Sequence, residues 1–136
     1  MYTIQGKYNE LDNPTELEKL QYAANIHNNI KEKVEAYIKP NIKLLDIVEF
    51  IESNIEKELP QQVHKGKAFP VGVSVNNCAA HFTCHPKCSK TLKKDDLISI
   101  DYGVHYDGNI IDSAFTFSLD NKYDELLQYS QEATEL

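Results

Sequence analysis

The sequence predicts an α+β fold in which helices pack on one face of a mostly antiparallel sheet. Two observations support this prediction. The first half of the chain holds two stretches with apolar residues at helical spacing, and each is followed by a proline. The second half holds short alternating segments, two of which are joined by Asp107-Gly108, a strong signal for a tight hairpin turn.

The first helix is expected to begin at Asn13 and to end before Pro40. Asn13 suits the N-cap, Pro14 the first helical position, and Glu16 follows the cap by three residues. His27 lies in this helix and is interpreted as structural or solvent-facing. The expected apolar face consists of Leu17, Leu20, Ala24, Ile30, Val34 and Ile38.

A second helix is expected between Asn41 and Pro60, and its apolar residues are interpreted as core. They are Leu44, Ile47, Val48, Ile51 and Ile55. The segments expected after it are a strand at 71–75, an extended piece at 78–83, a polar loop at 84–94, strands at 97–105 and 110–119, and a helix from 123.

Length and composition indicate one globular domain without a membrane span. The chain has 136 residues, 41% of them hydrophobic and 26% charged. Its 14 basic and 21 acidic residues give a net charge of −7, which disfavours nucleic acid or an anionic membrane as a partner and suits metal cations or a substrate with a free ammonium group. Three cysteines fit reduced thiols better than a disulfide scaffold. With no signal-peptide pattern, we expect a cytoplasmic protein.

Asp101 and Asp112 are predicted to converge on one face of the hairpin. If Asp107-Gly108 is a two-residue turn, Gly103 lies opposite Asp112 and Asp101 lies opposite Ala114. Opposed residues share a face, and so do residues two apart, so the two aspartates are diagonal neighbours with Cβ atoms roughly 7 Å apart.

Two carboxylates at that separation leave room for one or two cations, and the small residues Gly103 and Ala114 are expected to keep the space open. A bound metal would compensate the cost of placing acids on a half-buried face. On spacing alone, the alternative that both aspartates lie on a solvated face stays open. The opposite face is interpreted as core and holds Ile100, Val104, Ile111 and Phe115.

Several segments of the sequence resemble the type 2 methionine aminopeptidases. Residues 69–83, FPVGVSVNNCAAHFT, resemble the substrate-binding stretch of that family, and residues 100–105 and 108–116 resemble its first two metal-ligand segments. Residues 121–127 resemble the helix that follows. The asparagine pair followed by Ala-Ala-His is typical of type 2 rather than type 1. The resemblance covers about 120 residues.

The resemblance implies a pita-bread fold and metal-dependent removal of the initiator methionine from nascent polypeptides. It implies two divalent ions, drawn from Co, Mn, Fe and Zn, held by five protein ligands. By matching position, Asp101 would chelate one ion and Asp112 would bridge both. His81 would contact the methionine amide, take part in catalysis and match the histidine that fumagillin-type epoxides alkylate. Phe69 would line the pocket for the methionine side chain.

The three other ligands that the resemblance implies, a histidine and two glutamates, have no matching position in this sequence. We therefore interpret residues 1–12 as a short polar N-terminal segment and residues 13–136 as the N-terminal half of a pita-bread metallopeptidase catalytic domain. The isolated chain is expected to be catalytically incomplete. Two interpretations stay open: a truncated gene product or partial gene model, and a half whose fold is completed by a second chain or by self-association.

Two alternatives share the pita-bread fold. One is a non-catalytic protein with a binding or regulatory role in growth or translation, although relatives of that kind lose metal ligands and both aspartates are retained here. The other is a proline dipeptidase, which shares the aspartate pair but is less consistent with residues 76–81.

A third alternative is a small zinc module formed by His81, Cys84, His85 and Cys88, whose short spacings resemble zinc chelation. Pro86 and the crowding of the four residues weigh against it. His105 is expected on the Asp101 face, where it either supports a metal ligand or lines the hairpin.

Overall fold

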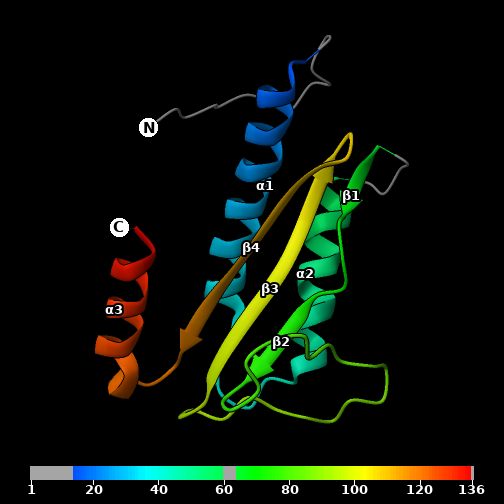
Figure 1. The fold of residues 1–136 in the computed structure, drawn as a ribbon. Coiled ribbons are helices and arrows are strands. Elements are labelled where there is room, and N and C mark those ends of the chain that lie inside the picture. Colours follow the sequence, from blue (N-terminus) through cyan, green and yellow to red (C-terminus); the bar gives the residue numbers. More distant parts are fainter. Residues whose placement is uncertain (1–13, 60–63, 136) are drawn as a thin grey trace.

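A computed structural model describes residues 14–59 and 64–135 of the chain. Figure 1 shows its elements along the sequence. They are α1 (Glu16–Tyr37), α2 (Leu44–Glu58), β1 (Lys65–Lys67), β2 (Gly72–Val75), β3 (Leu97–Tyr106), β4 (Asn109–Ser118), the short 3₁₀ helix η1 (Asn121–Tyr123) and α3 (Asp124–Glu135).

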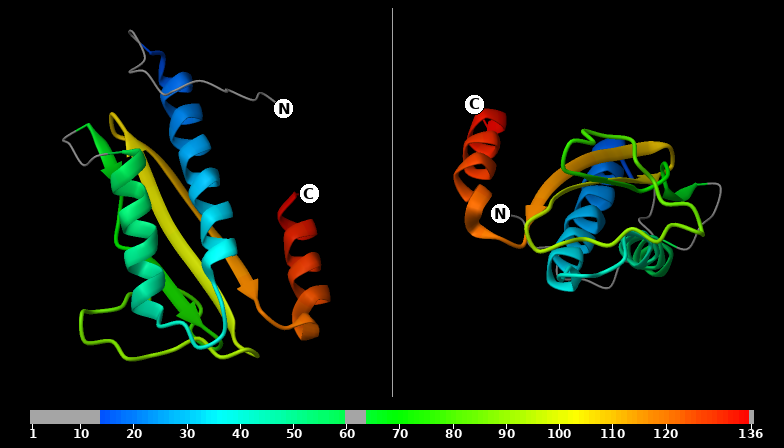
Figure 2. Two further views of the ribbon diagram at one scale, coloured as in Figure 1. Left: turned by 180° about the vertical axis from the view of Figure 1, so that it is seen from behind. Right: turned by 90° about the horizontal axis from the view of Figure 1, so that it is seen from below.

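The four strands form one antiparallel sheet with β3 at its centre. β4 pairs along one side of β3, and β1 and β2 pair along the other side, at opposite ends of the strand. The two long helices cover the same face of this sheet, and α3 stands apart from them (Figure 2). The predicted α+β class with helices on an antiparallel sheet is confirmed.

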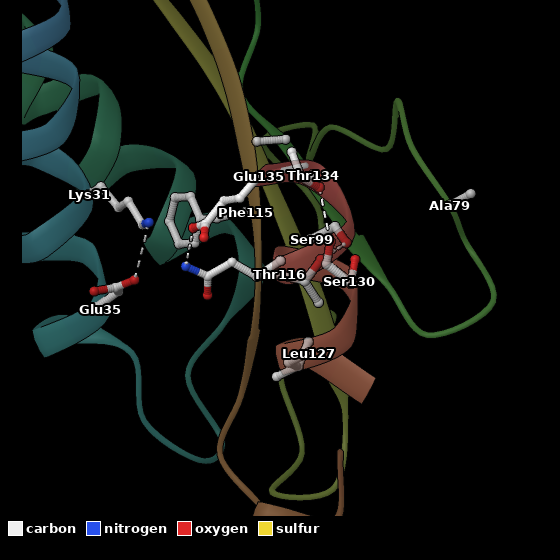
Figure 3. A pocket seen from close by; sticks show the side chains of 12 residues that line it. Lys31, Glu35, Ala79, Ser99, Phe115, Thr116, Leu127, Ser130, Thr134 and Glu135 are labelled. Carbon is white, nitrogen blue, oxygen red and sulfur yellow. Dashed lines mark hydrogen bonds and ion pairs between the residues drawn. The ribbon is translucent and has the colours of Figure 1, made fainter. Parts of the chain in front are cut away.

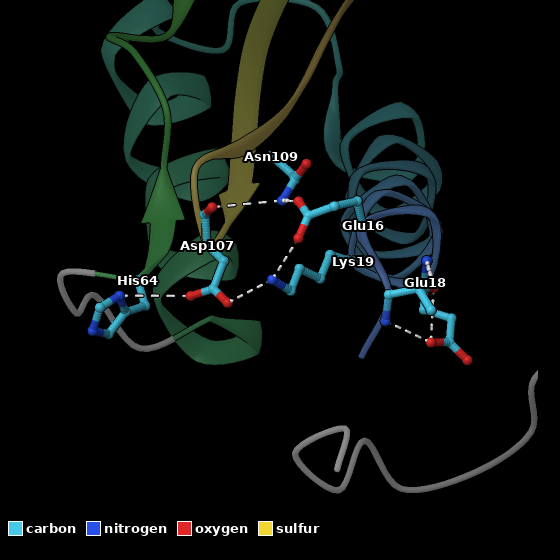
Figure 4. Close-up of polar contacts among 7 residues, drawn as sticks. Glu16, Glu18, Lys19, His64, Asp107 and Asn109 are labelled. Atoms are coloured by element: carbon cyan, nitrogen blue, oxygen red, sulfur yellow. Dashed lines mark hydrogen bonds and ion pairs between the residues drawn. The ribbon is translucent and has the colours of Figure 1, made fainter. Parts of the chain in front are cut away.

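The hairpin turn between β3 and β4 is the predicted two-residue turn. Asp107 and Gly108 both adopt positive φ, 51° and 78°, as a type I′ turn requires. Asp107 also lies in a cluster of polar contacts with the start of α1 (Figure 4). Its carboxylate is 3.1 Å from Lys19 Nζ and 3.5 Å from His64 Nδ1, and Asn109 Nδ2 donates to Glu16 at 2.7 Å. These contacts hold the tip of the hairpin against α1.

The N-cap of the first helix lies two residues later than predicted, at Thr15 and not at Asn13. Thr15 is the N-cap, and it forms a capping box in which Glu18 N–H donates to Thr15 Oγ1 at 3.3 Å and Thr15 N–H donates to Glu18 at 2.8 Å. Pro14 therefore precedes the cap instead of opening the helix, and Asn13 lies outside the described residues. Asn13 and Thr15 each have a glutamate three residues later in the sequence, and Thr15 is the residue that forms the reciprocal bonds of the capping box.

The second helix begins at Leu44, not at the predicted Asn41. Asn41 has φ 66°, a left-handed conformation that cannot belong to a right-handed helix. Its N–H donates to Leu92 O at 2.7 Å, and Leu44 N–H donates to Lys90 O at 2.9 Å, so the loop before β3 fixes the start of α2. The predicted stop at Pro60 lies outside the described residues.

Two predictions about the strands need correction. The extended piece expected at 78–83 is not a strand, although two of its residues bond to β2. Cys78 N–H donates to the Val75 carbonyl at 3.1 Å, and Phe82 accepts from Val73 N–H at 2.7 Å and donates to Ser74 Oγ at 3.2 Å. Conversely, β1 was not expected, because Lys-Gly-Lys has neither β-branched residues nor apolar alternation.

The core lies between the two long helices and the sheet. The apolar face expected for α2 is buried throughout. In α1 the buried face is rotated from the predicted one: Ala23 and Ile26 join Ile30 and Val34, whereas Leu17 is 65% exposed. The fully buried large side chains are Tyr102, Ile26, Ile30, Leu44, Ile47, Ile51, Ile55, Leu59, Leu92, Ile98, Ile100 and Val34.

His27 is structural, one of the two roles expected for it. It is buried in α1, where its ring stacks on Tyr102 with centroids 4.1 Å apart. His27 Nε2 donates to the Tyr102 carbonyl at 3.0 Å, and the Tyr102 hydroxyl donates to the His27 carbonyl at 2.7 Å. This reciprocal pair joins the middle of α1 to the middle of β3.

Replacing Tyr102 with phenylalanine removes the buried hydroxyl and keeps the ring stack. We expect the free energy of unfolding to fall by about 1 kcal/mol, the net contribution of a buried hydrogen bond. Urea unfolding of Tyr102→Phe would measure this loss. The matched control is Tyr129→Phe, whose ring is 64% exposed and which should leave stability unchanged. Equal effects of the two substitutions would contradict a structural role for the hydroxyl.

Candidate functional site

Asp101 and Asp112 occupy the diagonal positions that the turn predicts. In the β3–β4 register Asp101 pairs with Ala114 and Gly103 pairs with Asp112. The intervening Tyr102 is buried under the helices, so the two aspartates lie on the opposite face of the hairpin. Asp112 is exposed and Asp101 is half-buried, so only Asp112 fits the solvated-face alternative.

Asp101 carries a polar atom without a partner. Its Oδ1 is buried and has no hydrogen bond to any described residue. Burial raises the pKa of this carboxyl first, and the negative charge of Asp112 raises it further, whereas His81 and His27 act in the opposite direction. A cation between the two carboxylates would satisfy Oδ1 and remove the repulsion, and carboxylate oxygens suit divalent ions. The residues present therefore fit a metal ion.

Gly72 on β2 allows the chain to pack closely beside Asp101. It pairs with Asp101 across the sheet, and a Cβ atom added at Gly72 would lie 3.3 Å from Asp101 Cβ and 3.9 Å from the Phe82 carbonyl oxygen. Sequence reasoning did not single out this glycine. The signal that was available is a glycine inside an otherwise apolar strand, which often marks a close backbone approach.

Phe69 lies over Gly103, on the face that carries the two aspartates. A Cβ atom added at Gly103 would come within 2.3 Å of the Phe69 ring, so the aromatic side chain rests directly on the glycine. Ala68 N–H donates to the Gly103 carbonyl at 2.9 Å and holds the segment there. The expectation that Gly103 leaves open space is therefore wrong directly above the glycine, where the ring of Phe69 lies.

His81 lies in the loop that follows β2 and is exposed. Its charge affects Asp101, which places it near the aspartate pair. Its neighbour Phe82 is bonded to β2 through both backbone groups, so the position of His81 is tied to the sheet. His81 has φ 64°, a left-handed conformation that costs a non-glycine residue roughly 1–2 kcal/mol. Such strain is more frequent at functional positions than elsewhere.

The other ligand candidates do not gather into a separate metal site. Among the described residues, no group of three or more His, Cys, Asp or Glu side chains is placed to hold a metal. The zinc module considered for residues 81–88 therefore finds no support. His105 lies on the Asp101 face, as the register predicted, and pairs with Ile110 and Gly66 on the neighbouring strands.

A cleft of about 490 Å³ separates α3 from the edge of the sheet (Figure 3). Residues of α1, β4 and α3 line it, with the Lys31–Glu35 ion pair on one wall and the Ser99–Thr116 hydrogen bond on another. None of the four candidate residues, Phe69, His81, Asp101 and Asp112, lines this cleft. The candidate site is instead an open face of the sheet. None of the described helices is both long enough and apolar enough to cross a membrane.

The fold is that of the pita-bread metallopeptidases, and solved structures of that type align with most of this chain. The methionine aminopeptidase of Thermotoga maritima aligns over 93% of this chain and 52% of its own, with a TM-score of 0.72 and 26% identity. The prolidase of Thermococcus sibiricus aligns over 88% of this chain and 32% of its own, with a TM-score of 0.71 and 19% identity, which shows likeness of fold alone.

The sequence comparisons identify the family. Residues 18–136 match metallopeptidase family M24, and the chain belongs to that family. Methionine aminopeptidase 2 of Encephalitozoon intestinalis is 39% identical over 133 residues, which are 95% of this chain and 37% of the relative. Methionine aminopeptidase 2 of Saccharomyces cerevisiae is 40% identical over 119 residues, 82% of this chain and 28% of the relative. The chain thus spans 37% and 28% of the length of these two relatives, and the resemblance found in the sequence is confirmed.

Replacing Asp101 with asparagine should stabilise the chain when no divalent metal is present. The substitution removes a charge that is desolvated and repelled by Asp112, and we expect the free energy of unfolding to rise by about 1 kcal/mol at neutral pH. Because the folded-state pKa of Asp101 lies above its ordinary value, the carboxyl destabilises the fold as pH rises through that pKa. The gain should therefore shrink toward pH 4.

Urea unfolding of Asp101→Asn in EDTA at the two pH values would measure this gain. Asp95→Asn is the matched control, because Asp95 is exposed in the turn before β3. A loss of stability in Asp101→Asn at neutral pH would show that the carboxylate has a compensating partner.

Adding a methyl group at Gly103 should destabilise the fold through Phe69 alone. The new Cβ overlaps the aromatic ring, and overpacking of this kind costs about 1–3 kcal/mol. In a Phe69→Ala background the obstacle is gone, so Gly103→Ala should cost much less. A double-mutant cycle by urea unfolding measures the coupling between the two positions. Additive effects would mean that Phe69 does not lie on Gly103.

Proposed function

We propose that this chain forms the substrate-binding and first metal-ligand part of a type 2 methionine aminopeptidase, which removes the initiator methionine from nascent proteins. The observation that carries the proposal is the partnerless, buried Oδ1 of Asp101 beside the charge of Asp112. Among the described residues, every other buried side-chain nitrogen or oxygen has a hydrogen-bond partner, so the unpartnered oxygen of Asp101 supports a bound ligand at this position. Relatives named methionine aminopeptidase 2, at 39–40% identity, support the choice of reaction.

In this proposal Asp101 chelates one divalent ion and Asp112 bridges two. When bound, the ions would supply Lewis acidity and lower the pKa of a water to near neutrality. Asp112 projects from the exposed strand β4, and Asp101 projects from the central strand β3. The exposed carboxylate of Asp112 and the half-buried carboxylate of Asp101 would therefore hold the ions from two neighbouring strands. Carboxylate ligands suit harder ions such as manganese, but two carboxylates alone do not select among Mn, Co, Fe and Zn.

His81 and Phe69 would act on the substrate. His81 stands near Asp101 on a loop anchored to β2, where its imidazole can hydrogen-bond to the amide of the terminal methionine and stabilise the reacting centre. Phe69 presents its ring above Gly103, which gives an apolar surface beside the aspartate pair for the methionine side chain. The substrate's free amine would bind near the metals, which restricts cleavage to the N-terminus.

The remaining ligands would come from outside the described residues. Among the described residues no third His, Cys, Asp or Glu joins the aspartate pair in a metal-binding group. We therefore propose that a further stretch of the same polypeptide, a second chain or another copy of this chain completes the site. The open sheet face that carries the aspartates, rather than the helix-covered face, is where that part would pack.

Two other functions remain outcomes of the test. The prolidase likeness is one of fold, so cleavage of a dipeptide with proline in second position would replace the proposed substrate class. Metal binding without hydrolysis of either substrate would favour a non-catalytic role in growth or translation.

A chimera tests the proposal with a complete set of ligands. This chain would replace the matching 37% of the Encephalitozoon intestinalis enzyme, to which it is 39% identical. We expect manganese- or cobalt-dependent release of methionine from a Met-Ala-Ser peptide and inhibition by EDTA. Asp112→Ala in the chimera should lower kcat/KM by more than about 100-fold, because a bridging ligand matters more than its supporting residues. His81→Ala should lower kcat by about 100-fold and leave metal binding intact.

Asp95→Asn is again the control for loss of an exposed acid, and it should leave activity unchanged. The isolated chain, assayed in parallel, is expected to release no methionine unless it assembles with another copy. An Asp112→Ala chimera with normal activity would sink the ligand assignment, and a folded, metal-loaded chimera without activity would sink the proposed reaction.

A further inference from the structure

Cys84 and Cys88 lie side by side in the loop between β2 and β3. Their sulfur atoms are 3.0 Å apart, and both thiols are free. A turn from His85 to Cys88 brings them together: Cys88 N–H donates to the His85 carbonyl at 2.8 Å, and Pro86 occupies the second position, where its fixed φ favours a turn. Lys87 N–H donates to His85 Nδ1 at 3.1 Å and supports the same turn.

Both ends of this turn are attached to the body of the fold. Cys84 packs against the hydrophobic core. Beyond Cys88, the Lys90 carbonyl accepts from Leu44 N–H at 2.9 Å, and Thr91 forms a β-bridge with Lys43 at the start of α2. Folding therefore fixes the two sulfur atoms close together and does not leave them to meet by chance.

The two thiols have different environments. Burial, and then the hydrogen bond and charge of Cys88, raise the pKa of Cys84 to about 12. The pKa of Cys88 is lowered by the hydrogen bond from Cys84 and by the Lys90 N–H. Cys88 is thus the thiol that ionises more readily, and thiolates are the attacking species in disulfide exchange. Cys78 lies apart from this pair, with its sulfur 3.7 Å from the Ala80 carbonyl.

We propose that Cys84 and Cys88 form a redox-sensitive thiol pair that a small-molecule disulfide, such as oxidised glutathione, converts into an intrachain disulfide. The Cys88 thiolate attacks one sulfur of the small disulfide, whose S–S bond breaks and releases one thiolate. Cys84 then loses its proton to water and attacks the Cys88 sulfur of the mixed disulfide, which releases the second thiolate. The two cysteines are oxidised by two electrons, and one small disulfide is reduced to two thiols.

The geometry favours the second step. A disulfide needs sulfur atoms about 2.05 Å apart, so the pair must close by only about 1 Å. When Cys88 enters the mixed disulfide it loses its negative charge. Because that charge is one of the causes that raise the pKa of Cys84, its loss makes the Cys84 thiol easier to deprotonate. The ring closed by the new bond contains only the turn itself, so the strands need not move.

Equilibration of the folded chain in glutathione buffers of varied ratio, in EDTA, tests this pair. After acid quenching and alkylation, intact mass and peptide mapping count the thiols that remain. We expect two of the three thiols to be lost together, and Cys78 should stay free. No disulfide should form between chains. The midpoint should lie at a glutathione ratio at least about tenfold more reducing in the folded chain than in the chain unfolded by urea, because folding raises the effective concentration of the partner thiol.

Single substitutions separate the roles of the cysteines. Cys84→Ser should stop at a glutathione adduct on Cys88, Cys88→Ser should give no intrachain disulfide, and the control Cys78→Ser should keep the two-thiol transition. Equal midpoints in the folded and unfolded chains would overturn the proposal. So would a disulfide that includes Cys78, or one formed between chains in place of the Cys84–Cys88 bond.

Discussion

The register of the β3–β4 hairpin is the constraint on which the rest of the structure depends. Side chains alternate between the two faces, so a slip of one residue would turn Asp101 and Asp112 toward the helices and expose part of the core. The left-handed turn residues Asp107 and Gly108 set the register, and the Lys19 contact anchors the turn to α1. Ten pairs from Leu97↔Ser118 to Tyr106↔Asn109 then follow without a bulge. The turn thus determines both which side chains of the hairpin are buried and which face carries the two aspartates.

The core behind β3 gives the candidate site its rigidity. Tyr102 lies between Asp101 and Gly103 in the sequence and points the other way, into the helices, where it stacks on His27 and bonds to the α1 backbone. The backbone of Asp101 is therefore held by an aromatic side chain on the opposite face of the same strand. On the site face, small residues take over: Gly72 admits the close approach beside Asp101, and Gly103 admits the ring of Phe69. Large buried residues on one face of the strand thus fix its position, and glycines on the other face leave room for other groups to pack close to the aspartates.

Local patterns in the sequence predicted two features that depend on neighbouring residues. The Asp-Gly turn predicted the register, and the period of α2 predicted its buried face. The N-cap of α1 was harder to predict, because Asn13 and Thr15 each have a glutamate three residues later. Only the hydrogen bonds seen in the structure decide between the two candidates. The left-handed conformation of Asn41 accompanies the hydrogen bond that its N–H donates to the carbonyl of Leu92, far along the chain. The contact of Phe69 with Gly103 joins two segments that no sequence period connects. Those features require tertiary contacts, which a single sequence does not display.

Asp101 brings stability and function into conflict. A folded chain gains nothing from a carboxylate whose buried oxygen lacks a partner and whose neighbour has the same charge. A neutral residue would fit the strand better in the isolated chain, and a cation would reverse that balance by offsetting both costs at once. The left-handed His81 adds a second local cost close to the same place. The other left-handed non-glycine residues, Asn41, Asn76 and Asp107, lie in turns, whereas His81 lies in the irregular loop after β2. A bound cation would offset the cost at Asp101, and this balance is the physical argument for the metal site proposed on the open face of the hairpin.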